Sequence, residues 1–70
     1  MSTVLERVNK EGNELFRKIQ KLHMFIESEQ FKVLDEDNKA LLEEQVEVMH
    51  SYLTILTKRL KTLEEKQDDR

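Results

Sequence analysis

The stretch Ala40–Leu63, ALLEEQVEVMHSYLTILTKRLKTL, decides the fold of this 70-residue chain. It contains neither proline nor glycine, the two residues that disfavour a helix most strongly. Apolar side chains recur in it at alternating spacings of four and three residues, a pattern typical of one face of an α-helix. The members of this first stripe are Leu42, Val46, Met49, Leu53, Leu56, Leu60 and Leu63. The stretch is therefore predicted to be a helix with an apolar face.

A second apolar stripe runs beside the first on the same predicted helix. Its apolar members are Leu41, Val48, Tyr52 and Ile55. Two further positions of this stripe are occupied by the polar Gln45 and the charged Arg59. Two adjacent stripes form a face too wide for a single neighbouring helix to cover. Because the chain is too short for more than one other long helix, we expect copies of the chain itself to cover the rest. The expected fold class is all-α, an antiparallel two-helix hairpin that assembles into a homo-oligomeric helical bundle.

Composition sets further bounds on the fold and the partners. A chain of this length is one domain at most and usually needs a disulfide, a metal ion or oligomerisation for stability. The absence of cysteine excludes disulfides and thiolate metal sites. No transmembrane run or signal peptide is recognisable, so we expect a cytoplasmic protein without a membrane partner. The net charge of −3 argues against binding to duplex nucleic acid.

The N-terminal half is predicted to form the other long helix. Thr3 and Glu6 have the spacing of a capping box at its start. Gly12 occupies a position in its apolar stripe, where it weakens the helix by about 1 kcal/mol relative to alanine. We interpret this glycine as a site of close packing against a neighbouring backbone or as a kink, and the alternative is that it leaves room for a ligand. The stripe consists of Leu5, Val8, Leu15, Ile19, Leu22 and Ile26.

Two long helices joined by a short connection are expected to lie antiparallel. The predicted bounds within a single domain, 1–70, are a helix at about 3–32, a turn at about 33–36, a helix at about 37–65 and a frayed polar tail. Facing positions then place Phe16 and Arg17 beside Tyr52. The same register gathers basic side chains of both helices, Arg7 and Lys10 among them, toward the open end of the hairpin.

Patterns typical of catalysis are missing from the sequence. There is no cysteine nucleophile and no glycine-rich phosphate loop, and the acids of the second helix fit an exposed helix face. We therefore expect no enzyme, no cofactor and no metal site. His23 and His50 should face each other across the hairpin, and we interpret them as a polar or half-buried pair. A shared metal ion or a pH switch is the alternative for these histidines.

The basic residues at the open end offer the clearest ligand chemistry. Guanidinium and ammonium groups that converge from two helices suit a phosphate, and an aromatic ring can stack on a base. Arg59 stands in the second stripe, where a charge needs an anion or a carboxylate unless its side chain reaches solvent. The alternative for the whole cluster is an ordinary solvated helix surface. The candidate ligand-binding residues are Arg59, Arg7, Lys10, Asn13, Phe16, Arg17 and Tyr52.

Part of the chain resembles a known family. Phe31 and Leu34 form a Phe-x-x-Leu motif, and the segment Leu41–Leu60 reads Leu-Leu-x-x-Gln-x-x-x-Met-x-x-Tyr-x-x-Ile-Leu-x-x-Arg-Leu. This pattern is similar to that of the helical-hairpin proteins of tailed phages that include the anti-CBASS cyclic-nucleotide sponges. The resemblance covers residues 15–61.

The resemblance implies a function that the residues alone do not. Such sponges are homo-oligomers, typically hexamers, that sequester cyclic di- or trinucleotides of bacterial immunity between their subunits without cleaving them. The resemblance implies action in the host cytoplasm, and it makes Arg59, at the motif arginine, a candidate phosphate ligand. The alternative function is that of a structural or protein-binding helical hairpin of a phage with no nucleotide ligand.

Overall fold

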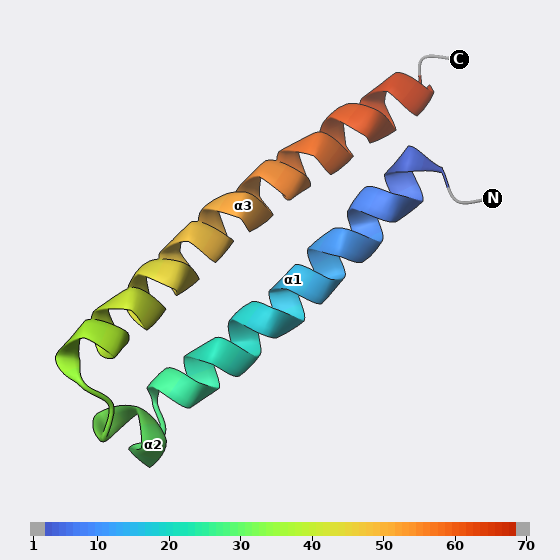
Figure 1. Cartoon of the computed structure of the whole chain (residues 1–70). Helices are drawn as coiled ribbons and strands as arrows, with labels where there is room; N and C mark the ends of the chain where they lie inside the picture. The colour runs from blue at the N-terminus through green and yellow to red at the C-terminus, as the bar shows by residue number, and fades with distance from the viewer. Residues whose placement is uncertain (1–2, 69–70) are drawn as a thin grey trace.

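Two long helices, α1 (Val4–Ile26) and α3 (Glu36–Asp68), lie side by side and antiparallel, and the short helix α2 (Glu29–Lys32) connects them at one end (Figure 1). This computed structural model describes residues 3–68, and for residues 67 and 68 it describes the backbone alone. The start of α1 and the end of α3 lie at the end of the hairpin away from α2 (Figure 1). The prediction of an all-helical hairpin is confirmed. None of the helices described is long and apolar enough to cross a membrane.

The start of α1 has the capping box that the sequence predicts. The backbone N–H of Glu6 donates to the Thr3 hydroxyl at 3.1 Å, and the backbone N–H of Thr3 donates to the Glu6 carboxylate at 2.8 Å. These two bonds satisfy N–H groups that have no partner within the helix. These hydrogen bonds also lower the pKa of the Glu6 carboxylate below its ordinary value. The bond from the Thr3 backbone has the larger effect, and the bond with the Thr3 side chain has the smaller one.

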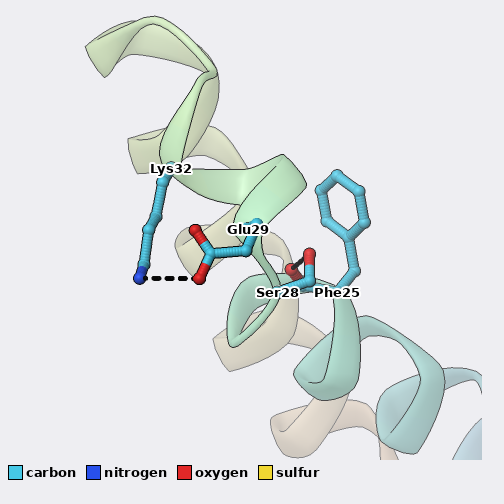
Figure 2. A network of polar contacts seen from close by, with 4 residues as sticks. All are labelled: Phe25, Ser28, Glu29 and Lys32. Atoms are coloured by element: carbon cyan, nitrogen blue, oxygen red, sulfur yellow. Dashed lines mark hydrogen bonds and ion pairs between the residues drawn. The ribbon is translucent and has the colours of Figure 1, made fainter.

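The predicted first helix at about 3–32 is wrong in its C-terminal bound, because α1 ends at Ile26. The Ser28 hydroxyl donates to the Phe25 carbonyl at 2.6 Å (Figure 2). In a continuous helix that carbonyl would accept the backbone N–H of Glu29 instead. Ser28 is extended and becomes the N-cap residue of α2, and Lys32 pairs with Glu29 at 3.2 Å across that single turn (Figure 2). The connection therefore spans residues 27–35 and is not a tight turn at about 33–36.

Helix α3 begins at Glu36, one residue before the predicted start, and continues to Asp68, three residues beyond the predicted end. Its first turn is fixed by Asp35, whose carbonyl accepts from the backbone N–H of Lys39 at 3.0 Å. The tail predicted to fray is therefore helical as far as Asp68, and residues 69–70 lie outside the described part of the chain. At the closed end the Phe31 ring packs edge-on against the Phe25 ring, with ring centres 6.4 Å apart.

The core runs between α1 and α3 and uses the apolar stripes that the sequence predicts. Leu56 is completely buried, and the first stripe supplies the other α3 side chains of the core. Because one stripe of α3 meets one stripe of α1, the interior is a single apolar seam along the hairpin. The side chains packed in it are Val8, Leu15, Ile19, Val46, Met49, Leu53, Leu56, Leu60 and Leu63.

Gly12 is buried in this seam, and α1 continues through it as a regular helix. A Cβ atom at this position would meet only the Leu53 Cδ1 atom, at 4.0 Å, which is ordinary van der Waals contact. Packing within one hairpin therefore does not require glycine here. The interpretation of Gly12 as a site of close packing against a neighbouring backbone is wrong for the contact between α1 and α3.

The second stripe of α3 remains exposed, as the width of its apolar face predicts. Exposed fractions are 61% for Leu41, 62% for Val48, 41% for Tyr52 and 53% for Ile55. Helix α1 covers the first stripe alone, because a single neighbouring helix reaches only one side of α3. The hairpin by itself thus leaves an exposed apolar strip along its longest helix, interrupted by Gln45.

Candidate functional site

The hairpin has two sides, each marked by one side-chain contact between α1 and α3. On the tyrosine side the Tyr52 hydroxyl donates to the Glu11 carboxylate. On the histidine side the Nε2 atoms of His23 and His50 lie 3.0 Å apart, which confirms the prediction that the two histidines face each other. These two contacts place the remaining candidate residues, because residues seven apart on a helix share a face.

Arg59 lies on the tyrosine side, seven residues after Tyr52 on α3. Its side chain is exposed and lines a shallow hollow of about 310 Å³ together with Ile55 and Leu63. None of the acidic side chains described in the structure forms an ion pair with Arg59. Its guanidinium group is therefore available to an anion at the border of the second stripe.

The chemistry around Tyr52 is set by its two charged neighbours. The hydrogen bond to Glu11 raises the pKa of Tyr52 above its ordinary value, burial and the Glu11 charge act in the same direction, and Arg59 opposes them. The Tyr52 hydroxyl is the donor in this contact with α1. Arg7 precedes Glu11 by four residues, which puts it on the tyrosine side of α1 as well.

Three of the candidate residues, Lys10, Asn13 and Arg17, lie elsewhere, on the outer face of α1. They line a polar hollow of about 450 Å³ together with Glu14 and other exposed side chains. Lys10 is two residues from the buried Val8, which turns it about 200° away from the hairpin core. Lys10 also approaches Glu14 to 4.0 Å, so the positive charge of this face is partly balanced.

The prediction that Phe16 and Arg17 lie beside Tyr52 is wrong, because Tyr52 contacts Glu11 instead. Phe16 precedes His23 by seven residues and therefore belongs to the histidine side, where it is 49% exposed. The expected register assumed a turn centred near residue 34. The contact between His23 and His50 agrees with that register, so the error concerns the side of the helix: Phe16 lies five residues after Glu11, about 140° round α1.

A further hollow of about 320 Å³ lies on the tyrosine side nearer to α2, and the sequence did not single it out. Lys18, Lys21 and Phe25 line it from α1, and Gln45 and Met49 line it from α3. Its surface is mainly apolar with two lysines at the edge. The family pattern could have indicated this hollow, because Gln45 and Met49 are two of its motif positions.

The fold and these surfaces define a class of protein: an all-helical hairpin whose long helix has an uncovered apolar strip beside an arginine that no described side chain pairs with. A comparison with protein families supports a closer assignment, since the family described as Sequestin matches residues 2–62. The chain belongs to the Sequestin family, the family of the anti-CBASS cyclic-nucleotide sponges, and the predicted resemblance is confirmed. Members of this family are binding proteins and not enzymes. No curated protein and no solved structure matches the chain.

Proposed function

We propose that this chain is a phage anti-defence protein that binds cyclic di- or trinucleotides in the host cytoplasm and sequesters them without cleaving them. The observation that carries the proposal is membership of the Sequestin family over residues 2–62. An immune effector that depends on such a nucleotide would remain inactive for as long as the protein holds it. This mode of action needs tight binding and no chemical step.

A homo-oligomer is part of this proposal, and the second stripe supports it. Four large side chains of α3 have exposed fractions between 41% and 62% in the isolated hairpin. Another copy of the chain offers an equivalent apolar strip, so association of copies would remove both strips from water. A hexamer is the assembly that the family resemblance implies.

The nucleotide sites in this proposal lie between copies. A single hairpin distributes the seven candidate residues over three surfaces, the tyrosine side, the outer face of α1 and the histidine side. Association through the second stripe would bring a surface of another copy next to Arg59 and Tyr52. We propose Arg59 as a phosphate ligand, because a guanidinium group can donate two parallel hydrogen bonds to phosphate oxygens. Tyr52 would stack on a base or donate to it.

The test is a calorimetric titration of the protein with a panel of cyclic di- and trinucleotides. At least one of them should bind, and denaturation of the complex should return it intact. Arg59→Ala should weaken binding about tenfold to hundredfold, the effect of losing one charged hydrogen-bonding group, with the assembly preserved. Lys61→Ala is the matched control, because it removes the same charge from an exposed α3 position about 200° round the helix.

Other results would contradict the proposal. Absence of binding to every member of the panel would favour the alternative of a protein-binding or structural hairpin. Dissociation of the assembly by Arg59→Ala would make this arginine a structural residue. Recovery of hydrolysed nucleotide would exclude sequestration without cleavage.

A further inference from the structure

The histidine side holds the two histidines of the chain in direct contact, one from each long helix. The Nε2 atoms of His23 and His50 are 3.0 Å apart, and the ring centres are 5.3 Å apart. The separation of the ring centres exceeds that of the Nε2 atoms by about twice the distance from a ring centre to a ring nitrogen, so the two nitrogens point at each other in the geometry of a hydrogen bond. Both side chains are exposed, so an ion from solution can reach them.

This separation is close to what two imidazoles need to share one metal ion. Metal–nitrogen bonds of about 2.0–2.1 Å place two ligand nitrogens about 2.9 Å apart at a right angle and about 3.3 Å apart at a tetrahedral angle. The observed distance lies between these values. Rotation of the exposed side chains would turn both lone pairs toward a common ion while the helix backbones stay in place.

The charges around the pair also favour a cation. Among the residues three and four positions away from either histidine along the chain, the charged ones are Glu27, which follows α1, and Glu47 on α3, and both are acidic. No lysine or arginine occupies any of these neighbouring positions. A divalent ion therefore meets two imidazole nitrogens and nearby negative charge.

We propose that His23 and His50 form a binding site for a divalent transition-metal ion, Zn²⁺ or Cu²⁺, that clamps α1 to α3 independently of nucleotide binding. Imidazole nitrogen is a preferred ligand of both ions. The residues described in the structure contain no cluster of three or more His, Cys, Asp and Glu side chains placed for a metal. The ion accordingly keeps open positions, which water fills.

The proposal predicts measurable metal binding and stabilisation. Titration of untagged protein with ZnCl₂ should show one ion per chain, and His23→Gln and His50→Gln should each lower the affinity at least tenfold. At a free Zn²⁺ concentration about tenfold above Kd, the melting temperature should rise by about 6 °C or more at constant protein concentration. Glu27→Gln and Glu47→Gln serve as controls, because they remove the nearby carboxylates and leave both imidazoles in place.

A mixing experiment distinguishes a clamp within one chain from a bridge between chains. His23→Gln and His50→Gln proteins are unfolded together, refolded and titrated again. A site within the hairpin stays weak in this mixture, because neither chain has both imidazoles, whereas restored affinity would overturn the clamp. Absence of Zn²⁺ binding up to about 1 mM, or equal binding by the double variant, would overturn the metal site itself. Circular dichroism checks that every variant remains helical.

Discussion

The substitution Val48→Asp tests whether the second stripe is an interface between copies. Val48 is 62% exposed in the isolated hairpin, and it lies on the same face of α3 as Leu41 and Ile55. In a monomer an aspartate at such an exposed position is solvated and has little effect on the fold. In an assembly held together by the stripe, the same carboxylate is forced into an apolar contact.

The size of the effect follows from the exposed fractions. Full burial of a large apolar side chain contributes about 1.5–3 kcal/mol, and roughly half of that remains to be gained for each of the four side chains of the stripe. Covering the stripe therefore contributes about 3–6 kcal/mol per copy. Val48→Asp removes about 1 kcal/mol of this and adds the cost of an unpaired buried carboxylate, which is several kcal/mol. We expect the concentration at half assembly to rise more than about a hundredfold.

Sedimentation velocity at micromolar concentration measures the effect, and circular dichroism verifies the helix content. Thr57→Asp is the matched control, since valine, threonine and aspartate have similar helix propensities. Thr57 is exposed, lies nine residues after Val48 and thus faces the opposite side of α3, and its hydroxyl donates only to the Leu53 carbonyl of its own helix.

We expect the wild-type protein and Thr57→Asp to sediment as the same oligomer and Val48→Asp as a smaller species. A wild-type protein that is monomeric under these conditions would refute the reasoning. The reasoning would also fail if Val48→Asp sedimented like the wild-type oligomer.

Three further substitutions test the fold. Leu56→Ala should lower the free energy of unfolding by about 2–5 kcal/mol in a urea titration, since Leu56 is completely buried, and a loss below about 1 kcal/mol would contradict the assigned core. Gly12→Ala should raise it by up to about 1 kcal/mol, because the added methyl meets Leu53 only at 4.0 Å, and destabilisation would reveal a neighbour of Gly12 outside the hairpin. The lowered pKa of Glu6 means that its contribution is present above the ordinary pKa of 4.5 and is lost as the pH falls through the lower folded value. Glu6→Gln should therefore show a smaller loss of stability between neutral and acidic pH than the wild type, and an unchanged loss would argue against the capping box.

The sequence predicted the parts of the fold that follow from periodicity. The first stripe of α3 forms the core, and the second remains exposed because one neighbour cannot cover both. The break after Ile26 could not be predicted in the same way. It depends on Ser28, whose backbone N–H and hydroxyl both donate to the Phe25 carbonyl, and a serine at this position is compatible with a continuous helix as well.

The candidate site was less predictable than the fold, because it depends on which residues of α1 face which residues of α3. The register alone does not say on which side of the hairpin a residue lies, and Phe16 lies on the histidine side, away from the contact between Tyr52 and Glu11. The contact between His23 and His50 was predicted correctly. Arg59 was singled out because a charge in an apolar stripe is unusual whatever the register. Its side chain is exposed and forms no ion pair with the described side chains, and its role as a phosphate ligand stays a prediction.

Native mass spectrometry with a panel of cyclic di- and trinucleotides tests the proposed function most directly. A single spectrum reports the number of chains in the assembly and the mass of every nucleotide it retains. We predict a homo-oligomer that retains at least one of the nucleotides and releases it with its mass unchanged when the protein is denatured. A chain that stays at the mass of the monomer and retains no nucleotide would contradict the proposal.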